Sequence, residues 1–257
     1  MSRTVFVNGT FVPYEDAKIP IMDRGFLFGD GIYEVSAVLA GRLVDSDGHF
    51  ARLDRSLREI RIGNPYGAAE WARLCEELVR RNGLAEGLVY MQVTRGVAER
   101  DFAFPKDGAP TVVMFTQAKN ITRSPQAETG VGVVTVPDLR WKRRDIKSVA
   151  LLAQVLAKQA AAEAGVAEAW MLEDGFVTEG SSSTAFIITR DKRVVTRPLS
   201  HAVLPGITRL SVMRLAAENG LVVDERLFTL EEALAASEAF LTSASMIVTP
   251  VVAIDGR

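Results

Sequence analysis

Hydrophobic and polar residues alternate as in strands at the start of the chain and then change to a helical spacing. Two β-rich runs flank Asn8-Gly9, a residue pair typical of a two-residue hairpin turn. Further on, apolar residues recur every three or four positions, and one such run stops at Asn82-Gly83. The pattern predicts a hairpin over 4–7 and 10–12, a strand over 32–39, helices over 50–60 and 71–78, and strands over 88–94 and 111–116.

A polar segment interrupted by Pro125 follows, and we expect it to be an interdomain linker. Beyond it, strands are expected over 131–136, 169–172, 176–178, 185–189 and 194–196, near 240, and over 247–254. Two helices are expected to carry apolar stripes, formed by Val149, Leu152, Leu156 and Ala160 and by Ile207, Leu210, Met213 and Ala217. We therefore expect an N-terminal domain over 1–118, a linker over 119–130 and a C-terminal domain over 131–257. Because strands and helices mix without strict alternation, the expected class is α/β, of the mixed α+β kind.

Composition narrows the possible functions. The 257 residues include 30 Lys and Arg against 32 Asp and Glu, and a net charge of −2 argues against nucleic acid as a partner. One cysteine, Cys75, and two histidines are too few for a three-histidine or Cys/His metal site, so no metal is expected. The N-terminus has no apolar signal region and no run is long enough to span a bilayer. These features favour a cytoplasmic protein without a membrane partner.

Two segments have the residues that covalent cofactor chemistry needs. Lys147 ends a basic run at a strand-to-helix junction, where Asp145 or Ser148 is a plausible N-cap, and a neutral lysine amine is the nucleophile of Schiff-base chemistry. The alternative is a solvated basic turn. Glu179 is followed by a glycine and four hydroxyl residues, which could keep it ionised beside a protonated ring nitrogen. The alternative there is the polar edge of a hairpin.

Two further segments could bind anions. Ile207 and Thr208 follow Gly206 at a predicted helix start, where free backbone N–H groups suit a phosphate, although an ordinary helix start has the same pattern. The loop over 93–102 carries Arg95 and Arg100, and an arginine there could bind a substrate carboxylate or simply lie at the surface.

Taken together, the motifs resemble the fold-type IV aminotransferases, which depend on pyridoxal 5′-phosphate. The matching stretches, in order along the chain, are 24–34, Arg52, 145–148, 178–183 and 206–209. Within the family the sequence is most similar to bacterial D-amino acid transaminases, through residues 92–96 and 140–159. The resemblance implies a smaller N-terminal α/β domain, a larger C-terminal pseudo-barrel domain, and an active site between them.

The resemblance also implies roles for individual residues. Lys147 would form the Schiff base with pyridoxal phosphate and carry the proton transfers, and Glu179 would keep the pyridine nitrogen protonated. The remaining cofactor-binding residues would be Arg52 at the phosphate, Leu204 on the ring, and Ile207, Thr208, Ser243, Ala244 and Ser245. The substrate-binding residues would be Tyr33, Val35, Arg100, Phe102 and Ser183. Arg100 would reach over from a partner subunit, which implies a homodimer.

The implied reaction is a ping-pong transfer of an amino group. A D-amino acid such as D-alanine would convert the cofactor to pyridoxamine 5′-phosphate, and a 2-oxo acid such as 2-oxoglutarate or pyruvate would convert it back. The D preference follows from the resemblance alone.

The sequence departs from the family pattern at three places. Phe102 stands where close D-transaminases have a histidine, which implies weaker carboxylate binding and tolerance of (R)-amines. Ala244 stands where a threonine is usual, and the chain stops at Arg257, where relatives continue, so a truncation is expected.

Alternative functions remain open at this point. Within the family they are an (R)-selective amine transaminase, a branched-chain L-amino acid aminotransferase and an aminodeoxychorismate lyase. Outside it they are a non-catalytic binding protein of the same fold, and a hydrolase using Cys75 or a serine of 181–183, for which no histidine partner is evident.

Overall fold

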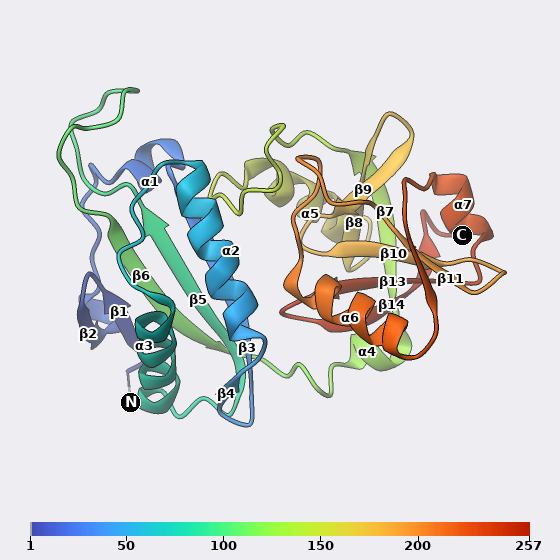
Figure 1. Cartoon of the computed structure of the whole chain (residues 1–257), viewed down its shortest axis with the longest axis horizontal. Helices are drawn as coiled ribbons and strands as arrows, with labels where there is room; N and C mark the ends of the chain where they lie inside the picture. The colour runs from blue at the N-terminus through green and yellow to red at the C-terminus, as the bar shows by residue number, and fades with distance from the viewer. Residues whose placement is uncertain (1) are drawn as a thin grey trace. The chain divides into compact units, whose positions relative to one another are not determined.

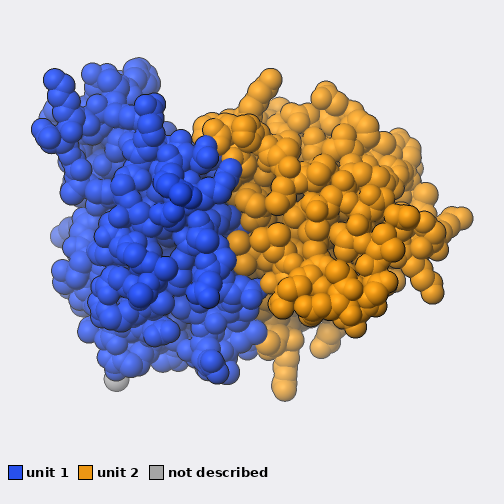
Figure 2. Space-filling view, in the orientation of Figure 1, with its two compact units in different colours: residues 1–120, 146–150 blue, residues 121–145, 151–257 orange. Residues whose placement is uncertain are grey.

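The structure, a computed structural model, describes residues 2–257 and divides into two compact units (Figures 1 and 2). Unit 1 contains the residues up to Asn120 together with Ile146–Ala150, and unit 2 contains Ile121–Asp145 and Leu151–Arg257. Each unit combines a sheet with helices, which confirms the mixed α/β class. The short segment 146–150 thus packs with residues far before it in the sequence. None of the helices described over residues 2–257 is long and apolar enough to cross a membrane.

Unit 1 is an antiparallel sheet packed against helices. Its elements are β1 (Thr4–Val7), β2 (Thr10–Pro13), a 3₁₀ turn (Tyr14–Asp16), α1 (Arg24–Phe28), β3 (Gly31–Leu39), β4 (Arg42–Leu43), α2 (Ser46–Glu59), α3 (Ala68–Arg81), β5 (Glu86–Thr94) and β6 (Thr111–Ala118). The strand order is β2-β1-β6-β5-β3-β4. The hairpin of β1 and β2 is confirmed, and both turn residues, Asn8 and Gly9, have positive φ.

The core of unit 1 explains why α2 and α3 form where the periodicity predicts them. Their apolar residues, among them Leu53, Leu57 and Trp71, are fully buried against β3 and β5. Full burial of each such side chain contributes about 1.5–3 kcal/mol. The helix α3 ends at Arg81 with Asn82 as its C-cap, and Gly83 follows with positive φ, as the sequence predicts.

Unit 2 is built on a larger sheet with both parallel and antiparallel neighbours. Its elements are α4 (Pro125–Thr129), β7 (Val131–Pro137), α5 (Leu152–Glu163), β8 (Glu168–Glu173), β9 (Phe176–Gly180), β10 (Thr184–Ile188), β11 (Arg193–Thr196), α6 (Ile207–Glu218), β12 (Val222–Glu225), α7 (Leu230–Ala235), β13 (Glu238–Ser243) and β14 (Ile247–Ile254). The order is β12-β11-β10-β13-β14-β7-β8-β9, and three neighbouring pairs are parallel. The helix α4 lies inside the segment expected as a linker.

The expected helix stripes of unit 2 are partly wrong. The helix α5 begins at Leu152, after Val149, and it buries Ala157 and Ala161, whereas Leu152 and Leu156 are exposed. Because this helix is apolar nearly all round, periodicity could not identify its packed face. In α6, Ile207 is buried as expected but Leu210 is 46% exposed.

Candidate active site

The backbone of residues 146–150 is fixed against the start of β3 in unit 1. The Tyr33 N–H donates to the Lys147 carbonyl at 2.9 Å, and the Val149 N–H donates to the Gly31 carbonyl at 3.1 Å. Ile146 is buried in the core of the unit and anchors the segment. The expected helix N-cap at Asp145 or Ser148 is wrong, since α5 starts only after Leu151. The lysine therefore lies in the irregular segment before α5, whose backbone is held by hydrogen bonds to β3 at Lys147 and at Val149.

The Lys147 side chain lies over the ring of Tyr33. Its Nζ atom is 4.3 Å from the ring centroid, and Lys147 has no ion pair among residues 2–257. Tyr33 itself stacks on Tyr90, which stacks on Phe115, at centroid distances of 5.6 and 4.6 Å. Val35 follows Tyr33 by two residues on β3, so both side chains face the same side of the sheet. The structure thus brings together two residues, Lys147 and Tyr33, that are remote in sequence.

Arg52 lies in a buried charge cluster of unit 1. Its Nε and Nη2 atoms donate to the two carboxylate oxygens of Glu34 at 2.7 and 2.8 Å. His49 Nδ1 lies 2.8 Å from the same carboxylate. Burial alone would raise the pKa of Glu34, but Arg52 and His49 outweigh it and lower the pKa to about 2. The orientation of the Arg52 guanidinium is therefore fixed by a partner that is ionised at neutral pH.

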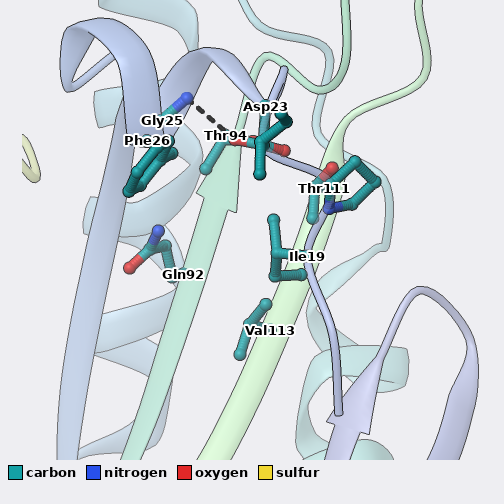
Figure 3. A pocket seen from close by; sticks show the side chains of 10 residues that line it. Ile19, Asp23, Gly25, Phe26, Gln92, Thr94, Thr111 and Val113 are labelled. Carbon is teal, nitrogen blue, oxygen red and sulfur yellow. Dashed lines mark hydrogen bonds between the residues drawn. The ribbon is translucent and has the colours of Figure 1, made fainter.

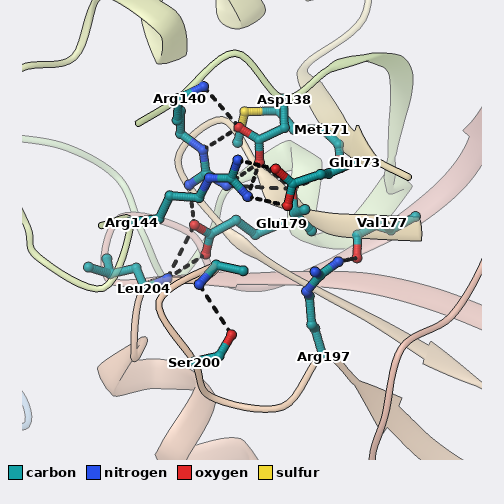
Figure 4. Close-up of polar contacts among 12 residues, drawn as sticks. Asp138, Arg140, Arg144, Met171, Glu173, Val177, Glu179, Arg197, Ser200 and Leu204 are labelled. Carbon is teal, nitrogen blue, oxygen red and sulfur yellow. Dashed lines mark hydrogen bonds and ion pairs between the residues drawn. The ribbon is translucent and has the colours of Figure 1, made fainter. Parts of the chain in front are cut away.

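Glu179 lies in a second buried cluster, in unit 2 (Figure 4). Arg140 Nη1 donates to its carboxylate, and the Leu204 N–H lies 3.2 Å from each carboxylate oxygen. Asp138 holds Arg140 through two hydrogen bonds of 2.9 and 2.6 Å and accepts one from Thr178 at 2.7 Å. Burial raises the pKa of Glu179, and Arg140 and the Leu204 N–H oppose that rise. Burial alone would lower the pKa of Arg140, but Glu179 and Asp138 outweigh it and raise the pKa.

The structure corrects two interpretations of these charges. The alternative of a solvated basic turn before Lys147 is wrong for Arg140 and Arg144, whose side chains are buried. Arg140 pairs with Asp138 and Glu179, and Arg144 pairs with Glu173, within unit 2. The hydroxyl residues after Glu179 do not hold Glu179. Instead, all three of Ser181, Ser182 and Ser183 donate to the buried carboxylate of Glu168 on β8.

The start of α6 forms a small polar cradle in unit 2. The helix has no side-chain N-cap, and a Cβ added to Gly206 would come within 2.8 Å of the Thr184 hydroxyl. Thr184 pairs with Thr242 across β10 and β13, and the buried Thr242 hydroxyl has no hydrogen-bond partner among the described residues. The Ser243 and Ser245 hydroxyls, just beyond, lie 3.3 Å apart. Free helix N–H groups beside an unsatisfied buried hydroxyl suit an oxyanion.

Arg100 and Phe102 lie on the long loop between β5 and β6. The Arg100 guanidinium carbon is 5.4 Å from the ring centroid of Phe28 and 5.6 Å from that of Phe102. Phe102 is 79% exposed. Arg100 and Phe102 therefore present a cation and an apolar side chain at the surface of the loop.

Several residues of these clusters were not identified from the sequence. They are Glu34, His49, Asp138, Arg140 and Glu168, each buried in the structure. A buried carboxylate has no local signature of its own, because its partners come from other elements of the fold.

Comparisons with known proteins identify the family of the chain. Residues 31–254 match the family model of the amino-transferases of class IV. The D-alanine aminotransferases of Staphylococcus aureus (strain MSSA476) and Bacillus licheniformis are each 40% identical to this chain, over 98% of it and 89% of their own length. The chain belongs to the class IV aminotransferases.

Solved class IV aminotransferases share the fold over the whole chain. The branched-chain aminotransferase of the archaeon Thermoproteus uzoniensis, solved with norvaline, has a TM-score of 0.91 at 28% identity, and the match covers 100% of this chain and 89% of that one. A second branched-chain aminotransferase, solved with pyridoxamine 5′-phosphate, has a TM-score of 0.90 at 26% identity, and the match covers 100% of this chain and 87% of that one. The fold expected from the family resemblance is thereby confirmed.

Class IV aminotransferases bind pyridoxal 5′-phosphate, and the residues of this aminotransferase fit that cofactor. A phosphate needs several donors, and the cradle at Gly206 presents free N–H groups next to the unpaired Thr242 hydroxyl. A protonated pyridine nitrogen needs an acidic partner, and the buried carboxylate of Glu179 meets that need. Covalent attachment needs a lysine amine outside an ion pair, which is the state of Lys147. Among residues 2–257 no group of three His, Cys, Asp or Glu side chains could hold a metal ion.

Proposed function

We propose that this aminotransferase moves an amino group between a D-amino acid, such as D-alanine, and a 2-oxo acid, such as 2-oxoglutarate or pyruvate, by a ping-pong mechanism. The similarity to D-alanine aminotransferases over nearly the whole chain supports the substrate class. The observation that carries the chemistry is the position of the Lys147 amine, which forms no ion pair within residues 2–257 and lies 4.3 Å from the Tyr33 ring centroid.

Bound pyridoxal phosphate would supply a carbonyl for covalent attachment and a ring that accepts electrons. Lys147 would carry that attachment until the substrate amine displaced it. The freed Lys147 amine would then remove the proton from the substrate Cα and pass it to the cofactor. The Lys147 backbone is held by hydrogen bonds, so the amine would approach the bound substrate from one face, and one enantiomer would be selected. Glu179 would hold the proton on the ring nitrogen, and Leu204, whose N–H contacts Glu179, would pack on the ring.

The phosphate would lie at the start of α6. Ile207 and Thr208 would offer backbone N–H groups, Ser243, Ser245 and the backbone of Ala244 would complete the cradle, and Arg52 would add a positive charge whose direction Glu34 fixes. Tyr33, Val35, Ser183, Arg100 and Phe102 would bind the substrate.

Half-reactions read from the cofactor spectrum test this proposal. D-alanine should convert the bound cofactor to pyridoxamine phosphate, and 2-oxoglutarate should convert it back. Lys147→Ala should lose both conversions, whereas Lys142→Ala, an exposed lysine of the same basic run, should retain them. Conversion by L-alanine or L-leucine in place of D-alanine would overturn the stereochemical assignment and favour a branched-chain L-aminotransferase.

A second function, (R)-selective amine transamination, is favoured by Phe102. An exposed aromatic side chain, in place of a polar one, offers apolar contact to a substrate without a carboxylate. Turnover of (R)-1-phenylethylamine with pyruvate, measured beside D-alanine with 2-oxoglutarate, separates the two activities.

We also propose a homodimer that shares its active sites. Unit 1 exposes Ile21, Phe26 and Phe102, which are 75%, 74% and 79% accessible. Ile21 and Phe26 line a cavity of about 290 Å³ with Gln92 and Thr94 (Figure 3). Unit 2 likewise exposes Leu139, Leu152 and Leu156. Apolar side chains gathered at a surface mark a contact with another molecule.

Subunit mixing tests the sharing of sites. The two chains to be mixed are Lys147→Ala and Arg100→Ala, each inactive alone. If Arg100 acts in the partner's site, co-expression should restore about a quarter of the parental activity. Random pairing makes half of the dimers heterodimers, and each heterodimer then has one intact site out of two. No recovery would place Arg100 in the site of its own chain. A cytoplasmic location stays a prediction of the sequence.

A further inference from the structure

The loop between β5 and β6 is held by a buried arginine of α1. In the described chain, no backbone–backbone hydrogen bond involves residues 99–110. Instead, Arg24 Nη1 donates to the Asp101 carbonyl at 2.5 Å and the Ala103 carbonyl at 3.3 Å, and its Nη2 donates to the Phe102 carbonyl at 3.4 Å. Arg24 is only 3% exposed. One guanidinium thus donates hydrogen bonds to the carbonyls of the three residues that directly follow Arg100.

Arg24 is itself oriented by Asp30, which a second arginine shares. Arg24 Nε donates to Asp30 at 2.8 Å, and Arg95 donates to the same carboxylate at 2.7 and 2.9 Å. Burial alone would raise the pKa of Asp30, but Arg95 and Arg24 outweigh it and lower the pKa. The Arg95 guanidinium carbon also lies 3.5 Å from the ring centroid of Phe104, which directly follows the three residues whose carbonyls Arg24 binds. The loop is therefore fixed at two points by one Arg24–Asp30–Arg95 triad.

We propose that this triad is a positioning device that fixes the loop bearing Arg100 and Phe102, and thereby sets the affinity for the substrate carboxylate. The inference rests on the proposed role of Arg100 in substrate binding. Side chains that select a substrate must be held by a rigid support, and a loop without backbone hydrogen bonds has no support of its own. Apolar side chains of similar volume often stabilise a fold as well as a buried ion pair does, so stability alone explains this arrangement less well.

The holoenzyme of Arg24→Gln tests the proposal, with Asp30→Asn as a second variant that keeps the shape of the carboxylate. Both should raise the KM for D-alanine about tenfold while kcat changes less than about twofold. Arg73→Gln is the matched control, because Arg73 is a surface arginine of the same unit paired only with its helix neighbour Glu70, and it should match the parent. Arg24→Gln should add little to Arg100→Gln, because both changes remove the same function.

Trypsin provides a readout that does not depend on activity. Cleavage after Arg100 and Lys106 should be about tenfold faster in Arg24→Gln than in Arg73→Gln under conditions where both holoenzymes are folded. Melting temperatures measured alongside identify any contribution from global unfolding. An unchanged cleavage rate, or a fully additive Arg24→Gln/Arg100→Gln double variant, would overturn the positioning role. An unchanged KM in Arg100→Gln, with loop cleavage still accelerated by Arg24→Gln, would instead overturn the proposed substrate contact and leave the triad as the anchor of the loop.

Discussion

The cluster around Glu179 makes a quantitative prediction about pH and stability. Replacing Arg140 with Met keeps the volume of the side chain but removes the cation between Glu179 and Asp138. Asp138 keeps the Thr178 hydroxyl at 2.7 Å and Arg144 at 3.5 Å. Glu179 keeps only the Leu204 N–H. The uncompensated charge in Arg140→Met is therefore that of Glu179.

The cost of that charge is limited by protonation. Breaking a buried ion pair from one side costs about 3–5 kcal/mol. Glu179 can instead take up a proton, which from its usual pKa of 4.5 costs about 4 kcal/mol at about pH 7.5 and about 1.4 kcal/mol at about pH 5.5. We expect Arg140→Met to lose about 3–4 kcal/mol of unfolding free energy at the higher pH and about 1–2 kcal/mol at the lower.

The sign follows from the direction of the pKa shift. Burial raises the pKa of Glu179 in the folded state, and removing Arg140 raises it further. The folded variant then binds a proton that the unfolded chain releases, so its stability is highest at low pH and falls as the pH rises through the folded pKa. Urea unfolding of cofactor-free protein at both pH values measures the difference, since bound cofactor would add its own stabilisation.

Glu179→Gln provides the control. The double variant Arg140→Met/Glu179→Gln has no charge to protonate at this position, so its stability relative to Glu179→Gln should not depend on pH over this range. If Arg140→Met lost the same free energy at both pH values, or if the double variant were as pH-sensitive as Arg140→Met, the reasoning from an uncompensated carboxylate would be refuted.

Three further predictions concern single sites. Because the pKa of Glu34 is lowered to about 2, its ionisation contributes about 3 kcal/mol to the free energy of unfolding above about pH 4.5, and this contribution is lost as the pH falls towards 2. The stability of Glu34→Gln should lack this dependence on pH when acid unfolding is measured. Burial raises the pKa of the Cys75 thiol to about 12, so a thiol reagent at about pH 8 should react with Cys75 only in urea, and rapid reaction of the native protein would contradict its burial. Phe102→His adds a donor near Arg100 and should lower the KM for D-alanine severalfold, while reducing any (R)-1-phenylethylamine turnover; equal effects on both would refute a carboxylate-specific role.

The sequence predicted the parts of the fold that local physics determines. The hairpin at Asn8-Gly9 and the end of α3 at Asn82 depend on backbone conformations that few residue types adopt, so they could be read directly. The packed face of α5 could not be predicted, because apolar residues occur on both its buried and its exposed side and leave no clear apolar stripe. Which residues of α5 are buried depends on the sheet against which the helix packs, and that is a tertiary property.

The site follows the same division. Lys147 and Glu179 were identified because motifs in a known order surround them. Their buried partners were not, because Arg140 reaches Glu179 across 39 residues and Arg24 reaches the loop carbonyls across 77 to 79. The hydroxyl residues after Glu179 were correctly expected to bind a carboxylate. Their positions in the sequence could not show that this carboxylate belongs to Glu168. Long-range pairing of charges is information that only the folded chain contains.

The chain of unit 1 is not continuous, and this limits how the protein can be dissected. Residues 146–150 complete the edge of β3 and bury Ile146 in the core of that unit, although the flanking residues on both sides belong to unit 2. A fragment ending at Asn120 would leave the Tyr33 N–H and the Gly31 carbonyl without their partners and open a space where Ile146 packs. Splitting the gene at the linker would therefore leave unit 1 incomplete. A chimaera that exchanges unit 1 must also include residues 146–150 and the two points, on either side of Lys147, where the chain passes between the units.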